Sequence, residues 1–365
     1  MTSKKLNNVY VIAEAGVNHN GSYSLAKRLV NEACKAGADA IKFQIFNSNN
    51  LAVKNARKAN YQKKLTDHKE NQYEMLKKLE LSRTNFIHLK KYCREKNITF
   101  LSSIFDEESL DFLVNTLKVK KVKIPSGEIT NGPLLYKTAK LGCEIILSTG
   151  MSNLDEIKQA LSIITLGYLS KNKKDHKINL NMAYKAFNTS KGKKILNKKL
   201  TLLHCTTEYP TPIKDINLNA MLTLSEEFNL RVGYSDHSEG FFVSIIALAM
   251  GAEVIEKHFT IDKNLPGPDH QASLNPIELK KMIKTINETS LIMGSANKKI
   301  TKSELKNLYI ARKVIVAKES IKKGSKFSSK NITSKRAGKG ISPMKFWKLL
   351  GKKSRKNYNK DQVIK

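Results

Sequence analysis

The sequence predicts an α/β protein whose larger part is a (β/α)8 barrel, followed by a small second domain. Eight short apolar runs alternate with amphipathic stretches over about the first 290 residues, which is the count that such a barrel requires. Beyond residue 295 the chain changes to a polar connector and then to short strands, glycine turns and one short helix. We therefore expect a barrel over 1–295, a linker over 296–308 and a separate domain over 309–365.

The apolar runs are the expected barrel strands, because each is short, rich in strand-forming residues and bounded by turn-forming ones. In chain order they are 9–14, 39–44, 98–103, 119–126, 143–149, 200–205, 231–235 and 252–258.

Helices are expected between the strands, where apolar residues recur with helical spacing. Asn153 and Asn275 are suited to begin helices, and Gly37, Gly142 and Gly251 stand where helices should end. The expected helices are 22–36, 84–96, 106–117, 132–141, 153–165, 217–228, 239–250 and 276–292.

Two long segments interrupt this alternation. Residues 45–83 follow the second strand and carry a short helical pattern around 70–79, so they are a candidate lid over the barrel mouth. Residues 166–199 are rich in lysine and asparagine and weakly patterned, so we expect an insertion that is poorly ordered at its centre.

The composition indicates a cytoplasmic protein that binds neither membranes nor nucleic acids. The net charge is +33, but its basic residues are nearly all lysines scattered over every segment, without a basic stripe interleaved with aromatics. No apolar run is long enough to span a membrane, and the first residues lack the apolar core of a signal peptide. The four cysteines form no motif and are expected to be free thiols.

A histidine directly follows or ends each of the last two expected strands. Because parallel strands joined by one helix present their C-terminal ends on one face, His237 and His258 should converge at the barrel mouth. Two imidazoles with open positions for substrate suit a divalent metal that acts as a Lewis acid. An isolated pair would more often be structural, but four neighbouring polar residues favour the metal, namely Ser235, Asp236, Glu256 and Asp269.

Every expected strand ends in polar or ionisable residues, which is where the chemistry of a barrel lies. Lysines, hydroxyls and glycine-flanked amides form a set suited to hold a phosphate or a carboxylate. Acid–base candidates are Glu14, Glu128 and Asp269, although Glu14 alone could simply pair with Lys42. The remaining strand-end residues are Gln44, Ser102, Ser103, Lys123, Ser126, Ser148, Thr149, His204, Thr206 and Thr207.

A metal beside an anion cradle indicates a reaction between an anionic carbon nucleophile and a carbonyl group. The metal would hold the carbonyl oxygen of the acceptor, and the cradle would hold an enol phosphate such as phosphoenolpyruvate. This is carbon–carbon bond formation by electrostatic activation.

Motifs spanning nearly the whole chain are similar to those of the sialic acid synthase family, with closest resemblance to its legionaminate-forming bacterial members. They are IAEAGVNHNGS (12–22), KFQ (42–44), KLEL (78–81), KIPSGEITN (123–131), IILSTGM (145–151), LLHCTTEYPTP (202–212), VGYSDHS (232–238), EKHFTIDK (256–263), GPDHQASL (267–274) and KRAGKGIS (335–342).

The resemblance implies a TIM barrel followed by a small SAF (antifreeze-like) domain, in a domain-swapped homodimer. It implies condensation of phosphoenolpyruvate with an N-acylated mannosamine-type sugar, giving a nine-carbon sialic-type acid and phosphate. It also implies that His237 and His258 hold a divalent ion, Mn²⁺ or Mg²⁺.

Individual roles follow from the same resemblance. Glu14, Tyr209 and Asp269 correspond to contacts with the sugar, and Glu128 corresponds to a proposed acid–base residue. Arg336 corresponds to an arginine that the SAF domain of one subunit lends to the active site of the other. Contacts with phosphoenolpyruvate correspond to Lys42, Ser103, Lys123, Ser126, Ser148 and Ser235.

The acceptor sugar is less strongly indicated. Phe43 in KFQ and Glu208 in TTEYP favour 2,4-diacetamido-2,4,6-trideoxymannose, with N,N′-diacetyllegionaminate as product, because an aromatic ring suits a sugar that lacks the 6-hydroxyl. N-acetylmannosamine, giving N-acetylneuraminate, is the alternative. The chain departs from family motifs where Ser103 and Ile104 replace threonine and proline, and where Ala337 replaces proline.

Two other functions are compatible with parts of the pattern. Lys42 or Lys123 could be the nucleophile of a Schiff-base aldolase, since both stand at strand ends. The C-terminal domain could instead bind carbohydrate or ice, although its many lysines disfavour an ice-binding surface.

Overall fold

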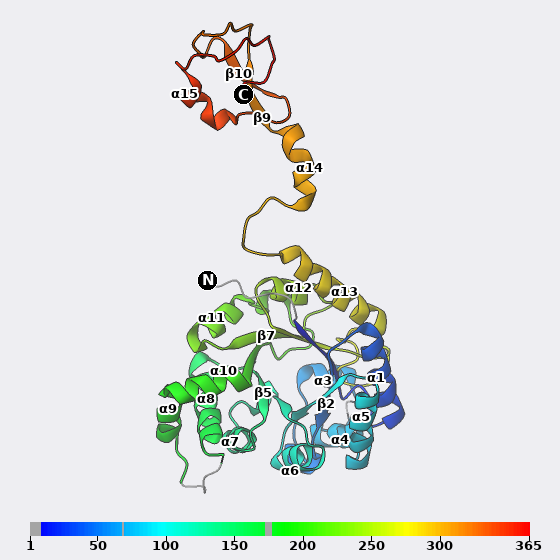
Figure 1. The fold of residues 1–365 in the computed structure, drawn as a ribbon. Helices are drawn as coiled ribbons and strands as arrows, with labels where there is room; N and C mark the ends of the chain where they lie inside the picture. The colour runs from blue at the N-terminus through cyan, green and yellow to red at the C-terminus, as the bar shows by residue number, and fades with distance from the viewer. Residues whose placement is uncertain (1–8, 68, 172–176) are drawn as a thin grey trace. The chain divides into compact units, whose positions relative to one another are not determined.

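The computed structural model describes residues 9–67, 69–171 and 177–365. The chain divides into two compact units, unit 1 over Met1–Gly294 and unit 2 over Ser295–Lys365 (Figure 1). Within the described part of the chain, none of the helices is both long and apolar enough to cross a membrane.

Unit 1 is a closed barrel of eight parallel strands in sequence order, and β1 pairs with β8 to close it. The predicted (β/α)8 architecture is therefore confirmed (Figure 1). The strands are β1 (Tyr10–Gly16), β2 (Ala40–Ile45), β3 (Thr99–Ile104), β4 (Lys121–Ile124), β5 (Glu144–Ser148), β6 (Leu200–His204), β7 (Arg231–Asp236) and β8 (Val254–His258).

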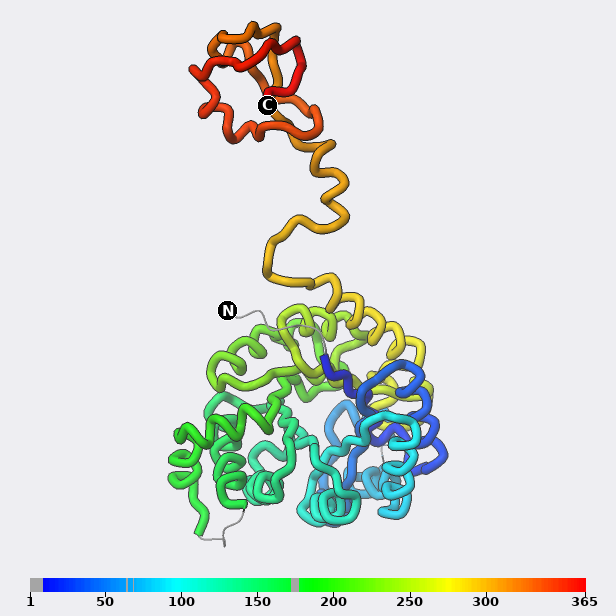
Figure 2. Tube along the Cα trace, in the orientation of Figure 1, coloured from blue at the N-terminus to red at the C-terminus, as the bar shows by residue number. Residues whose placement is uncertain are grey.

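Helices surround the barrel, as the trace in Figure 2 also shows. Asn153 begins one of them with a capping box, and Gly37 ends another in the left-handed region with a φ of 88°. They are α1 (Tyr23–Ala36), α5 (Arg83–Glu95), α6 (Glu107–Asp111) continued by a π-helical turn (Phe112–Thr116), α7 (Gly132–Lys140), α8 (Leu154–Leu169), α11 (Asn219–Phe228), α12 (Phe242–Ala249) and α13 (Pro276–Met293).

The segment 166–199 contains more regular structure than its weak sequence pattern indicates. It completes α8 and forms α9 (Leu180–Asn188) and α10 (Ser190–Lys199). These helices bury only a few side chains, Leu196 among them, and Gly192 packs so closely that a Cβ would lie 2.3 Å from the Ala186 carbonyl oxygen. A pattern based on large apolar residues misses such small-residue packing. The expected disordered centre includes 172–176, which lie outside the described residues.

The segment 45–83 carries three short helices rather than one. They are α2 (Ser48–Leu51), α3 (Asn60–Leu65) and α4 (Gln72–Leu79). Met75 and Leu79 of α4 pack with Val17 and Phe46 in a small apolar cluster at the end of the barrel where β1 and β2 finish. The segment therefore lies against the barrel mouth.

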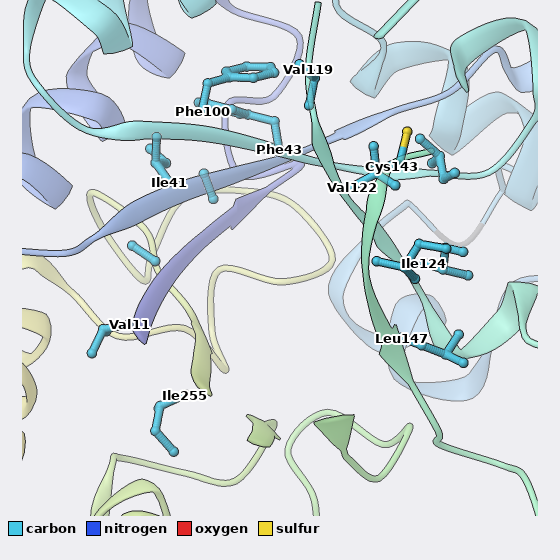
Figure 3. Close-up of a cluster of buried hydrophobic side chains, with 14 of the residues drawn as sticks. Val11, Ile41, Phe43, Phe100, Val119, Val122, Ile124, Cys143, Leu147 and Ile255 are labelled. Atoms are coloured by element: carbon cyan, nitrogen blue, oxygen red, sulfur yellow. The ribbon is translucent and has the colours of Figure 1, made fainter. Parts of the chain in front are cut away.

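Alternation along the strands sorts side chains to the two faces of the barrel wall. Outward residues such as Ile41, Phe43 and Phe100 pack in the large core between strands and helices (Figure 3). The expectation that the Phe43 ring suits the sugar is therefore wrong, because this ring faces away from the cavity. Inward residues form a lower apolar layer of Ile12, Ala40, Leu101, Ile146, Leu203 and Val254. Two residues further along, the inward positions become polar on five of these six strands, and β6 is followed there by Cys205. The apolar layer thus closes the barrel beneath a polar floor.

Unit 2 is a small domain with its own apolar core. It contains α14 (Lys302–Ala311), β9 (Lys313–Ala317) and the antiparallel β10 (Ile332–Arg336), and ends with a 3₁₀ turn (Pro343–Lys345) and α15 (Phe346–Leu349). The core includes Ile315, Phe327, Ile332 and Tyr358. Helix α14 begins inside the segment expected to be a linker.

Gly233 of β7 allows the closest packing in the lower barrel layer. A Cβ there would lie 2.4 Å from the Val254 carbonyl oxygen and 2.7 Å from Leu203 Cδ2. We expect Gly233→Ala to destabilise unit 1 by roughly 2 kcal/mol or more through overpacking. Urea unfolding measures this, with Gly132→Ala as control, because a Cβ at Gly132 meets nothing within 4 Å. Equal unfolding midpoints for the two variants would contradict the packing argument.

Candidate active site

A cavity of about 320 Å³ opens at the C-terminal ends of the barrel strands. Twelve of the thirteen residues to which the sequence analysis gave a catalytic, substrate-binding or metal-binding role line it. Arg336 is the exception, because it lies in unit 2, exposed at the end of β10. The twelve are Glu14, Lys42, Ser103, Lys123, Ser126, Glu128, Ser148, Tyr209, Ser235, His237, His258 and Asp269.

Glu256 joins the two buried lysines on the polar floor. Its Oε1 accepts hydrogen bonds from Lys123 Nζ at 2.8 Å and from Ser235 Oγ at 2.8 Å, and its Oε2 lies 3.5 Å from Lys42 Nζ. Burial alone would raise the pKa of Glu256, but the two ammonium groups outweigh it and hold this pKa far below its usual range. Glu256 is therefore a permanent anion between two cations.

Glu14 is the second carboxyl group of the floor. Its Oε2 lies 2.5 Å from Lys42 Nζ, which also donates to Ser103 Oγ at 2.9 Å. Burial raises the pKa of Glu14 despite the nearby Lys42, with Glu256 adding to the rise. The floor thus holds two ammonium groups, one firm carboxylate and one carboxyl group able to carry a proton, so it has positive charge to spare for an anion.

Several buried polar atoms around the cavity lack a hydrogen-bond partner. Ser148 Oγ and Thr207 Oγ1 are among them, as is His258 Nδ1. Because buried polar groups are normally hydrogen-bonded, their concentration at one cavity indicates a polar ligand. Hydroxyls beside buried lysines suit phosphate or carboxylate oxygens.

The two histidines face each other across one side of the cavity, with ring centroids 5.6 Å apart. His237 Nδ1 lies 2.6 Å from the Thr206 carbonyl oxygen and must donate to it, so Nε2 carries the lone pair. Ser235 Oγ is 3.2 Å from that Nε2, but its single proton is directed to Glu256. The Nε2 lone pair therefore remains available.

Burial keeps both imidazoles neutral, which is the form that binds a metal. It lowers the pKa of His237 to about 4, and burial with the neighbouring His237 lowers the pKa of His258 well below its ordinary value. Asp269 Oδ2 lies 3.9 Å from His258 Nδ1. Among the described residues no group of three histidine, cysteine or carboxylate side chains converges on one point. The residues fit a site in which two nitrogens leave the other positions to substrate and water.

Tyr209, Glu128 and Asp269 complete the wall. Tyr209 stacks on His237 with ring centroids 4.2 Å apart and meets the His258 ring edge-on at 5.4 Å. Glu128 Oε2 accepts from Asn131 Nδ2 at 2.7 Å. Burial raises the pKa of Glu128 and raises that of Asp269 to about 6. Asp269 is therefore suited to exchange a proton near neutral pH, and the pKa of Glu128 is shifted in the same direction.

Comparison with known families assigns both units. The NeuB family model matches residues 29–298, and the SAF domain model matches residues 312–365. The chain belongs to the NeuB family. The predicted resemblance to sialic acid synthases, with a barrel followed by a SAF domain, is therefore confirmed.

Curated relatives of this NeuB-family chain match it over nearly their whole length. It is 49% identical over 355 residues, 97% of this chain and 98% of the relative, to the N,N′-diacetyllegionaminic acid synthase of Campylobacter jejuni. It is 42% identical to the protein of the same name from Legionella pneumophila, over 94% of this chain and 89% of the relative. A solved N-acetylneuraminic acid (sialic acid) synthetase from Leptospira borgpetersenii, in complex with citrate, is similar with a TM-score of 0.65 and 33% identity, over 83% of this chain and 91% of the other.

A buried ion pair fixes the two NeuB-family strands that carry the histidines. Asp236 and Lys257 are cross-strand partners, and Lys257 Nζ lies 3.2 Å from Asp236 Oδ1. Asp236 also accepts hydrogen bonds from the backbone and hydroxyl of Ser238 and from the hydroxyl of Ser244. In sequence, Asp236 lies between Ser235 and His237, and Lys257 lies between Glu256 and His258. The pair therefore fixes the register in which the two imidazoles meet.

Sequence reasoning missed Glu256 as a site residue, although it noted this residue as a neighbour of the histidines. Its position two residues before His258 on β8 places both on the inward face, which was the available signal. Tyr61 of α3 also lines the cavity and was not singled out, whereas Thr207 was noted only as a strand-end residue. Tyr61 lies in a long segment whose path over the barrel no local pattern specifies.

Two further buried histidines hold the loops around Asp269. His270 Nε2 lies 3.1 Å from Asn20 Oδ1, and its Nδ1 lies 2.6 Å from Thr260 Oγ1. His19 Nδ1 accepts from the Gly21 backbone at 3.1 Å. Burial, followed by the neighbouring His270, lowers the pKa of His19 to about 3. Both rings are neutral structural groups.

These depressed pKa values predict acid sensitivity of the fold. In the unfolded chain His19 has a pKa of about 6.5, whereas in the folded protein its pKa is about 3. Between these two pH values the unfolded chain binds a proton that folded His19 does not bind, so the stability of the fold decreases as the pH falls through this range. His19→Asn keeps an acceptor near Gly21 and removes the titration, so its stability should fall less steeply between about pH 7 and pH 4.5. Urea unfolding at several pH values measures the slopes. Parallel curves for wild type and variant would contradict this assignment.

Proposed function

We propose that the protein condenses phosphoenolpyruvate with 2,4-diacetamido-2,4,6-trideoxymannose and water, giving N,N′-diacetyllegionaminate and phosphate. The names and near-complete coverage of the relatives at 49% and 42% identity support this acceptor. N-acetylmannosamine is the second candidate, supported by the likeness to a sialic acid synthetase at 33% identity.

The observation that carries the proposal is the pairing of two unlike subsites in one cavity. The lysine and hydroxyl floor suits the phosphate and carboxylate of phosphoenolpyruvate. The two neutral histidines suit a divalent ion, Mn²⁺ or Mg²⁺, which would polarise the aldehyde of the open-chain sugar as a Lewis acid. An enol phosphate and a carbonyl would therefore meet within the same small space.

In this reaction C3 of phosphoenolpyruvate forms a bond to the aldehyde carbon, and the carbonyl oxygen takes up a proton. Glu14, which can hold a proton in the cavity floor, is the proposed donor. Water then adds to the electron-poor C2 while Glu128 or Asp269 takes one of its protons. The C–O bond to phosphate breaks as the new C2 hydroxyl becomes the ketone, and the hydroxyl proton leaves with the phosphate. Lys42 and Lys123 offset the phosphate charge throughout.

The rival Schiff-base mechanism is less consistent with the floor. An amine nucleophile must lose its proton, but Glu14 and Glu256 outweigh burial and raise the pKa of Lys42. Burial lowers the pKa of Lys123, which nevertheless stays ion-paired to Glu256 at 2.8 Å. We accordingly propose that both lysines act as fixed cations, in a cytoplasmic enzyme whose four cysteines are free thiols.

We expect His258→Ala to bind Mn²⁺ at least about tenfold more weakly and to lose phosphate release, because half of the proposed ligand set is gone. Calorimetry measures the metal, and phosphate release from phosphoenolpyruvate with each candidate sugar measures the reaction. His88→Ala is the matched control, since His88 lies on the outer helix α5. Wild-type activity that survives EDTA, or a borohydride-trapped adduct on Lys42 or Lys123, would contradict the metal mechanism.

We also propose that the protein is a domain-swapped homodimer in which Arg336 of one subunit completes the site of the other. Arg336→Ala should lose most activity while retaining phosphoenolpyruvate binding. Mixing it with inactive His258→Ala subunits should restore up to roughly a quarter to a half of the sites, as expected for a shared site in a closed dimer. Phosphate release after remixing is the measurement, and the absence of recovery in a verified mixed dimer would contradict the exchange.

A further inference from the structure

The outer wall of the cavity has a different character from its floor. It is supplied largely by the segment 45–83, which is anchored by the apolar cluster of Val17, Phe46, Met75 and Leu79. Among the described cavity-lining residues, the lysines are Lys42 and Lys123, and both belong to the floor. The lining residues from the segment are uncharged, namely Leu51, Tyr61, Gln62, Gln72, Met75, Leu76 and Leu79.

Tyr61 of α3 connects this wall to the histidines through Tyr209. Its ring lies against Tyr209 with centroids 5.1 Å apart, and Tyr209 in turn stacks on His237. Burial, followed by the nearby Asp269, raises the pKa of Tyr61, so its phenol stays neutral. The three rings form a continuous aromatic series from the candidate metal site to the outer wall. An acceptor whose aldehyde lies at the histidines would extend along this series.

A buried lysine holds α3 in this position. Lys58 precedes the helix, and its Nζ donates to Thr66 Oγ1 at 2.8 Å and to the Asp67 carbonyl oxygen at 2.5 Å, beyond the helix end. The same Nζ lies 3.5 Å from Glu70 Oε1, and Glu70 pairs with Lys78 of α4. A helix of six residues is not stable alone, so the contacts of Lys58 provide stability that so short a helix lacks. We call these contacts the lysine brace.

We propose that α3 is the acceptor-selecting element of the site. Tyr61 packs against apolar groups of the sugar, such as acetamido methyl groups and a deoxygenated carbon, and Lys58 positions Tyr61 without touching substrate. The lining residues from the segment 45–83 offer no cation to a phosphate at the far end of the sugar, so α3 favours a free sugar over a phosphorylated one. This inference rests on the proposed function in one respect, namely that the acceptor is an N-acylated sugar.

The test compares Michaelis constants for the two substrates separately. Tyr61→Ala should raise KM for 2,4-diacetamido-2,4,6-trideoxymannose about 10- to 30-fold, the loss typical of a buried aromatic contact, and leave KM for phosphoenolpyruvate within about twofold. Tyr61→Phe should retain the wild-type constants, because the ring makes the contact. Tyr73→Ala is the control on the same segment, since Tyr73 is bonded to Asn49 rather than lining the cavity.

Lys58 provides the test of positioning. Lys58→Met should raise the sugar KM in the same direction as Tyr61→Ala, with kcat at saturating sugar little changed, and Lys58→Arg should partly restore it. Wild type should also use N-acetylmannosamine at least about tenfold better than its 6-phosphate, as expected when the segment 45–83 offers no cation to the phosphate.

The outcomes separate this inference from the function on which it rests. An inactive wild type with every sugar overturns the proposed function and the acceptor wall together. An active wild type in which Tyr61→Ala shifts both constants equally, or neither, overturns the acceptor wall alone. Equal use of the phosphorylated and free sugars would also overturn it.

Discussion

The ion-paired floor of the barrel is the constraint on which the site depends. Lys42, Lys123 and Glu256 are buried together, and removing such charges from water is costly unless each is paired. Glu256 pairs with both Lys42 and Lys123, but one permanent carboxylate cannot balance two ammonium groups. The floor therefore keeps an excess of positive charge. The residual field is the property that makes the floor a receptor for an anion. The net charge of +33 extends this attraction beyond the cavity and favours the approach of anionic substrates.

The periodicity of the strands accounts for how much of this arrangement could be predicted. A two-residue repeat fixes which side chains point inward, so the sequence alone assigns Glu14 and Lys42 to one mouth of the barrel. The same reasoning brought His237 and His258 together. It did not identify Glu256 as the group that joins the lysines, because pairing across the barrel depends on where eight strands meet in space. The barrel architecture and most of the wall were thus predictable, whereas the partners of each charge were not.

Short helices were the least predictable part for a related reason. Helix α3 depends on a lysine brace, and α10 depends on the close approach of Gly192 to α9. Neither arrangement produces a strong apolar repeat. In both places tertiary contacts supply the stability that a short helix lacks, so local sequence carries little of the information. The segment 45–83 was singled out by its length, but its aromatic contact with Tyr209 was not predicted.

The division between floor and outer wall separates chemistry from selection. The strand residues proposed to hold the enol phosphate are fixed by barrel register, and Asp236 with Lys257 fixes the register of the histidine-bearing strands. Residues of the segment 45–83 lie outside that register, on short helices that can change without moving a strand. A family can therefore keep one condensation and vary the sugar that enters it. Selectivity for an uncharged sugar then requires no new catalytic group. In the proposed complex the lysines of the floor face phosphoenolpyruvate, and the lining residues of the segment 45–83 present no charge to the sugar.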